Sequence, residues 1–257
     1  MASKALAESI LITGANRGIG LELVKQLASA AHPPSHIFAG ARNPDQSTEL
    51  RKLAETSGDK TDIRVVKLAV DSQTDIDAAV TTIGEVVGDK GLNLIINNAG
   101  ILGRDVASLS SVTSEAMVEH FRVNTVGPLM ISQAFHPLLK KAADAHKGGP
   151  LSVSKAAVVM MSTGVASIED NTSGGIYPYR CSKAALNMLG RTLSVDLKED
   201  QILVVNILPG YVATDMTANK GNITVEESVS SMLQTMASFG ADHNGGFYNR
   251  LGKVFPW

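Results

Sequence analysis

Short apolar runs alternate with helix-length segments along the whole chain, and this alternation constrains its fold more than any other feature. The apolar runs cover residues 10–13, 36–42, 63–70, 92–100, 155–163 and 201–210, and the helix candidates cover residues 18–30, a segment from about 45, and residues 71–87, 113–146, 179–199 and 225–238. Stretches such as "LVVNIL" and "AAVVMM" are apolar at consecutive positions, as in parallel strands buried on both faces. Right-handed crossovers place the connecting helices on both faces of such a sheet. We therefore predict an α/β fold with a mostly parallel sheet.

The chain of 257 residues has no internal repeat or low-complexity linker, and we predict a single domain over residues 1–257. Its formal net charge of −2 argues against a nucleic-acid partner. One cysteine and six scattered histidines give no metal-ligand spacing, so we predict no metal site. The first residues leave no room for a signal peptide, and no apolar run approaches the roughly 20 residues of a membrane span. We expect a soluble cytoplasmic protein without a membrane partner.

The first apolar run leads directly into "TGANRGIG", residues 13–20, where a helix candidate begins. Gly14 can form the tight turn after the strand, and Gly18 lets the backbone approach a pyrophosphate. The helix N-terminus adds amide groups and positive potential. A glycine-rich turn that binds nothing is the alternative, but the position directly after the first strand favours a dinucleotide site.

The end of the second apolar run distinguishes between the two nicotinamide dinucleotides. A site that prefers NAD usually places Asp or Glu there, to bond the ribose 2′-hydroxyl. This chain instead has Arg42 at the end of "FAGAR", and Arg17 lies inside the glycine-rich turn. Either arginine alone would commonly be a solvated surface charge. Two guanidiniums together suit a 2′-phosphate, so the pair predicts NADP(H).

The stretch "YPYRCSKAAL", residues 177–186, places Tyr179 and Lys183 one turn apart on the same face of a helix candidate. A free tyrosine has a pKa near about 10, and a cation about 4 Å away is worth roughly 4 kcal/mol at an effective dielectric of about 20. We therefore expect Lys183 to lower the pKa of Tyr179 toward neutral pH, where acid–base catalysis is efficient. A tyrosine packed beside a snorkelling lysine is the alternative. Cys181 lies on roughly the opposite face and is expected to pack inward.

Five motifs occur in an order that resembles the short-chain dehydrogenase/reductase family, in its compact single-domain form, over nearly the whole chain. They are "TGANRGIG", "NNAG" at 97–100, Asn124 in "FRVNTVGP", "YRCSK" at 179–183 and "PGYVATD" at 209–215. Within that family, "ASIEDNTSGGIYPYRCSKAALNML" and the final "PW" are similar to the sniffer and C-factor-like carbonyl reductases. The resemblance implies a Rossmann-type, doubly wound α/β fold with a seven-stranded sheet.

The resemblance also implies roles for individual residues. Tyr179 would be the proton donor, Lys183 would hold the nicotinamide ribose, and Asn124 would hold a water that links Lys183 to solvent. With the residues above, the predicted dinucleotide-binding set is Gly14, Asn16, Arg17, Gly18, Ile19, Gly20, Arg42, Val70, Asp71, Asn98, Ala99, Gly100, Tyr179, Lys183, Pro209, Gly210, Val212 and Thr214.

Two positions depart from the family pattern. A "SS" pair usually supplies the substrate-orienting hydroxyl, but this chain reads "MST", so we predict Thr163, with Ser162 and Ser167 as alternatives. The "LDV" that follows the third strand in many relatives reads "LAV" here. The Val70 backbone or Asp71 would then contact the adenine instead.

These features together predict an NADPH-dependent carbonyl reductase for small, fairly apolar ketones, aldehydes or quinones, with residues 215–225 as a flap over the substrate. One alternative is an NADPH-binding redox sensor or scaffold with little turnover. Another is an alcohol dehydrogenase that works in the oxidative direction with NAD. The resemblance further implies a homodimer, paired through the long helices that begin near Ser114 and Tyr179.

Overall fold

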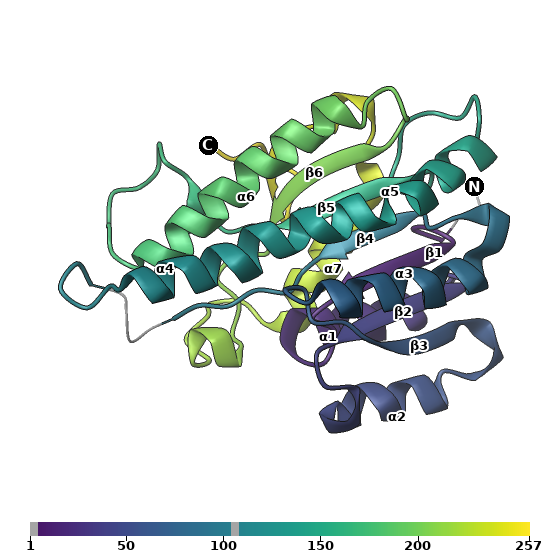
Figure 1. Ribbon diagram of the computed structural model, residues 1–257, viewed down its shortest axis with the longest axis horizontal. Coiled ribbons are helices and arrows are strands. Elements are labelled where there is room, and N and C mark those ends of the chain that lie inside the picture. The colour runs from purple at the N-terminus through teal and green to yellow at the C-terminus, as the bar shows by residue number, and fades with distance from the viewer. Residues whose placement is uncertain (1–4, 104–107) are drawn as a thin grey trace.

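The computed structural model describes residues 5–103 and 108–257 (Figure 1). Residues 1–4 and 104–107, which the predicted domain includes, lie outside the described part of the chain.

Seven strands form one sheet in which every neighbouring pair is parallel. The strands are β1 (Ser9–Thr13), β2 (His36–Ala41), β3 (Asp62–Lys67), β4 (Leu94–Asn97), β5 (Ala157–Met161), β6 (Leu203–Leu208) and β7 (Phe247–Asn249). Their order is β3-β2-β1-β4-β5-β6-β7, so the direction of winding reverses between β1 and β4. This arrangement confirms the predicted Rossmann-type α/β fold. The apolar runs in the sequence did not predict β7, which is only three residues long and lies at the sheet edge.

Helices cover both faces of the sheet (Figure 1). They are α1 (Gly18–Ala28), α2 (Thr48–Thr56), α3 (Gln73–Val87), α4 (Ser114–Phe121), α5 (Gly127–Ala145), α6 (Tyr177–Asp196) and α7 (Val225–Ser238). In Figure 1, α3, α5 and α6 lie in front of the sheet, and α1 and α7 lie behind it. No helix in the described ranges is long and apolar enough to cross a membrane.

Successive residues of β1 belong to opposite halves of the core. Ile10 and Ile12 belong to the cluster that contains α1 and α7, whereas Leu11 belongs to the cluster that contains α3 and α5. All three side chains are fully buried. Because both faces of β1 are buried, its sequence is continuously apolar instead of alternating.

The long predicted helix over residues 113–146 is interrupted by one π-helical turn, η4 (Arg122–Val126), between α4 and α5. Thr113 caps the start of α4 by accepting a hydrogen bond from the Ala116 amide. Single π-helical turns within helices are frequent at functional sites. This one carries Asn124, whose side chain is completely buried.

Candidate functional site

The glycine-rich turn after β1 is closed onto the end of β4, at the point where the winding direction reverses. The Thr13 hydroxyl accepts hydrogen bonds from the Asn98 and Ala99 amides, both at 3.0 Å. The Asn98 amide group donates to the Thr13 carbonyl at 2.9 Å and to the Gly14 carbonyl at 3.2 Å. Open α/β sheets bind their ligands in the crevice at such a reversal point. The Asn98 side chain therefore holds the turn in shape.

The glycines of this turn have the conformations that their positions require. Gly14 has φ +65° and Gly18 has φ +52°, in the left-handed region that favours glycine. A Cβ on Gly20 would lie 2.2 Å from the Gly14 carbonyl oxygen, so a side chain there would separate α1 from the turn. Helix α1 has no acidic residue in its first turn, so its positive N-terminal potential is unopposed.

Both predicted phosphate-binding arginines are exposed at this edge of the sheet. Arg17 is the N-cap residue of α1, and Arg42 directly follows β2. Arg17 lies 3.7 Å from the Asp215 carboxylate, and both side chains are 74% exposed, so this ion pair is weak. The amide groups, the positive potential and the two exposed guanidiniums fit a dinucleotide.

Helix α6 begins directly before the predicted proton donor. Its N-cap residue, Ile176, has φ +41°, an outlier for a β-branched side chain and a sign of backbone strain. The Ile176 carbonyl accepts hydrogen bonds from the Tyr179 and Arg180 amides. The Arg180 guanidinium in turn donates to carbonyls of the preceding loop, including Val165 at 3.0 Å. The strained start of α6 thus fixes where Tyr179 lies relative to the end of β5.

The three candidate hydroxyls after β5 have different surroundings. The Thr163 side chain acts on the Tyr179 phenol and opposes the rise of its pKa. Ser162 is buried and donates to the Asn187 side chain inside the protein. Ser167 is also buried and donates to the Trp257 carbonyl at 3.0 Å. Of the three, only Thr163 is paired with the tyrosine.

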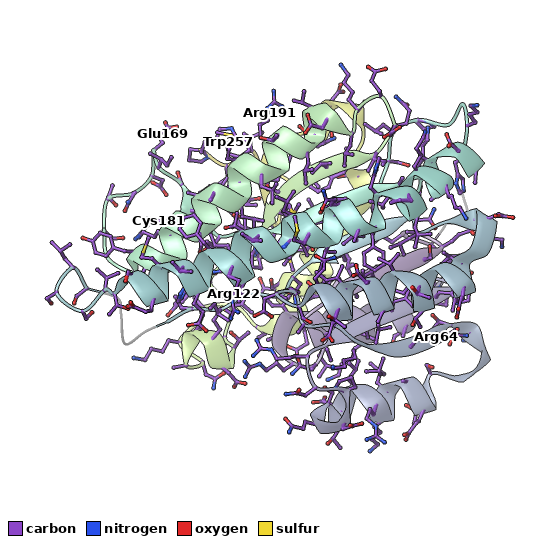
Figure 2. All side chains as sticks on the ribbon, viewed as in Figure 1. Arg64, Arg122, Glu169, Cys181, Arg191 and Trp257 are labelled. Carbon is purple, nitrogen blue, oxygen red and sulfur yellow. The ribbon has the colours of Figure 1, made fainter. Side chains whose placement is uncertain are left out.

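The loop that contains Ser167 is held by the last residues of the chain. The Trp257 carbonyl accepts hydrogen bonds from the Ile168 and Glu169 amides, both at 2.8 Å, as well as from Ser167. Glu169 and Trp257 lie beside each other in Figure 2. A Cβ on Gly164 would lie 3.4 Å from the Phe255 ring. Sequence reasoning missed this support, because the contact joins segments far apart in the chain.

Lys183 and Asn124 meet at the loop after β4. The Lys183 ammonium is 3% exposed and donates to the Met161 carbonyl at 2.7 Å. A Cβ on Gly100 would lie 3.2 Å from the Asn124 amide oxygen and 3.5 Å from the Lys183 nitrogen. The Asn124 side chain accepts a hydrogen bond from the Ile101 backbone amide at 2.9 Å and donates one to the Ile101 carbonyl at 3.1 Å. Glycine at position 100 therefore allows this loop to approach the catalytic candidates.

The pKa of Tyr179 differs from the expected direction. Burial raises it to about 12, and the hydrogen bond with Thr163 only partly opposes this shift. Burial likewise lowers the pKa of Lys183 from 10.5 to about 8. The expected lowering by the Lys183 charge does not occur: removal of the phenol from water raises the pKa of Tyr179, and Thr163 is the group that opposes the rise.

The remaining predicted positions lie at the same edge of the sheet. Asp71 forms an ion pair with Arg122 at 3.0 Å, so its carboxylate is turned toward η4. The Val70 side chain is buried. Gly210 has φ +89°, and Val212 forms a bridge with Ile223, which folds residues 215–223 back onto the "PGYVAT" segment.

One side-chain prediction is wrong: Cys181 is exposed instead of packed inward. Tyr179 and Lys183 turn their face of α6 toward the interior, so the opposite face lies on the surface. No group of three or more His, Cys, Asp or Glu side chains among the described residues could hold a metal ion.

The chain belongs to the short-chain dehydrogenase family, whose family model matches residues 8–223. The carbonyl reductase Sniffer of D. melanogaster has a similar structure, with a TM-score of 0.94 and 40% identity over 98% of this chain and 100% of that one. A carbonyl reductase from chicken fatty liver, crystallised with NADPH, has a TM-score of 0.91 and 42% identity over 98% and 99% of the two chains. The C-signal protein of Myxococcus xanthus is 34% identical over 166 residues, which cover 65% of this chain and 93% of that protein. The protein is therefore an oxidoreductase of this family, structurally close to carbonyl reductases.

The buried Lys183 gives a test of the site's electrostatics. Between pH 8 and 10.5 the folded protein has released the Lys183 proton while the unfolded chain still binds it. Raising the pH through this window therefore stabilises the folded state, by about 1.4 kcal/mol per pH unit. Urea unfolding of wild type and Lys183→Met at about pH 8, 9 and 10, within this window, measures the effect. The difference in unfolding free energy should shift in favour of wild type as pH rises, and a pH-independent difference would contradict the assignment.

Proposed function

We propose that the protein is an NADPH-dependent carbonyl reductase for small, fairly apolar ketones, aldehydes or quinones. The proposal is carried by the placement of Tyr179 one helical turn from the buried Lys183, with Thr163 acting on its phenol. The likeness to an NADPH-bound carbonyl reductase supports it. Residues 1–257 would act as one dinucleotide-binding domain.

The catalytic residues divide the work on the carbonyl group. Bound NADPH supplies the hydride that reaches the carbonyl carbon. Tyr179 donates its phenolic proton to the carbonyl oxygen, and Thr163 donates a hydrogen bond to the same oxygen as negative charge develops there. Lys183 would hold the nicotinamide ribose, and Asn124 would hold a water near Lys183.

Carbonyl reduction uses the Tyr179 phenol as a proton donor. A phenol with a pKa of about 12 carries its proton at neutral pH, as a proton donor must. Alcohol oxidation would need the same group as a base, and at neutral pH the deprotonated form is scarce. The likeness to carbonyl reductases supports the reductive direction, which we propose.

Substitutions at the hydroxyl groups test the catalytic assignment. Tyr179→Phe should lower kcat for a panel of dicarbonyls by about 10³-fold, and Thr163→Val by about 10²-fold, whereas Thr163→Ser keeps the hydroxyl and most of the activity. Ser162→Ala is the matched control, because it removes a hydroxyl that bonds to Asn187. Loss of NADPH absorbance measures turnover. Tight NADPH binding without turnover by wild type would favour the sensor alternative, and a greater loss in Ser162→Ala than in Thr163→Val would reverse the hydroxyl assignment.

The two arginines give a test of cofactor preference. Arg17→Ala and Arg42→Ala should each weaken NADPH binding by roughly 10- to 100-fold, because each removes charge-assisted hydrogen bonds to the 2′-phosphate. NADH binding should hardly change. Arg51→Ala, an exposed arginine on α2, is the control. Fluorescence titrations with both dinucleotides measure the affinities, and a wild-type preference for NADH would contradict the NADP(H) assignment.

We also propose a homodimer formed through α4, η4 and α6. These elements pack side by side (Figure 1). Arg122, Cys181 and Arg191 lie along them in Figure 2. The exposed apolar residues are Val118, Val126, Met188 and Val195. The exposed thiol fits the reducing cytoplasm that we propose as the compartment.

Light scattering tests the dimer. Wild type should elute with the mass of two chains, and Met188→Asp should dissociate it, because a charge on the buried interface would lose its water. Met188 is 67% exposed in the single chain. Leu251→Asp, at a residue 58% exposed outside these helices, is the control and should remain dimeric. A wild-type monomer at micromolar concentration would refute the proposal.

A further inference from the structure

His120 is a buried titratable side chain that the proposed mechanism does not use. It lies on α4, four residues before Asn124, and is 3% exposed. Its Nδ1 atom lies 2.7 Å from the Ala116 carbonyl oxygen, and its Nε2 atom accepts a hydrogen bond from the Gly103 amide at 2.9 Å. Both ring nitrogens are thus in use.

The two partners define the state of the ring. A carbonyl oxygen can only accept, so the proton lies on Nδ1. The Gly103 amide can only donate, so Nε2 must offer a lone pair. His120 is therefore neutral, and its ring links the helix backbone to the loop after β4.

That loop contacts the catalytic candidates at its other end. Gly100 approaches Lys183 and Asn124. The Asn124 side chain forms hydrogen bonds with both the backbone amide and the carbonyl of Ile101. Gly103 is the next point of attachment. The loop is consequently held by two side chains of one helix, Asn124 and His120.

We propose that His120 is a positioning residue for carbonyl reduction, because it fixes residues 100–103 against the α4–η4 helix and so sets the approach of Gly100 to Lys183. This inference rests on the proposed reductase function. His120 touches neither the substrate nor the reacting atoms and acts only through the loop.

A matched pair of substitutions tests the proposal. His120→Gln places an amide oxygen where Nε2 lies and can accept from Gly103, whereas His120→Leu fills the space without an acceptor. We expect Leu to lower kcat by about tenfold while NADPH affinity changes by less than about threefold, because the loop then misplaces the groups around Lys183, whereas the turn after β1 and the two arginines keep their contacts with the dinucleotide. Gln should restore most of the rate. Glu119→Gln, at the exposed neighbouring position, is the control.

Hydrogen exchange gives a readout that does not depend on turnover. The Gly103 amide should exchange about tenfold faster in His120→Leu than in wild type, and at nearly the wild-type rate in His120→Gln. Should the Leu variant fail to fold, His120→Asn replaces it, since its side chain is too short to reach Gly103. If His120→Gln and His120→Leu show equal kcat and equal exchange rates at the Gly103 amide, the proposal is overturned. A wild type without carbonyl turnover would refute the reductase function alone, because the exchange result stands independently.

Discussion

The burial of one ammonium group shapes the whole site. Lys183 is almost completely removed from water, and its hydrogen bond to the Met161 carbonyl joins α6 to the end of β5. Burial of a charged amine is costly unless it is bonded, and the lowered pKa of Lys183 records that cost. The neighbouring loop can approach so closely because position 100 has no side chain. The positions of β5, α6 and the β4 loop are thus linked through this residue.

The same burial separates the protonation behaviour of the two catalytic candidates. Removal from water favours the neutral form of each group, so the phenol of Tyr179 keeps its proton more strongly and the amine of Lys183 loses its proton more easily. At neutral pH the phenol therefore keeps its proton, and Thr163 is the group that opposes the rise of its pKa. This state is compatible with the proton-donor role that we propose for Tyr179.

Much of the fold could be predicted from the sequence, because a parallel sheet buried on both faces leaves continuous apolar runs. The positive φ angles of Gly14 and Gly18 likewise follow from a turn that only glycine adopts easily. Other features depend on tertiary packing. The pKa direction of Tyr179 and the exposure of Cys181 follow from which face of α6 is buried, and the pairing of Ser162 with Asn187 depends on how α6 lies on β5. None of these is visible in local spacing.

The spacing of His120 and Asn124 explains why one helix can hold an irregular loop at two points. One helical turn advances about 5.4 Å along the axis, and two residues of extended chain span at most about 7 Å. Side chains one turn apart can therefore reach Ile101 and Gly103, which are two residues apart. The π-helical turn begins between the two side chains, at Arg122, and changes the direction in which Asn124 leaves the helix. An uninterrupted α-helix would present both side chains along a single stripe, whereas here Asn124 also donates to Ser182 on α6 at 3.0 Å. The irregular turn thus lets one helix support both the loop and α6.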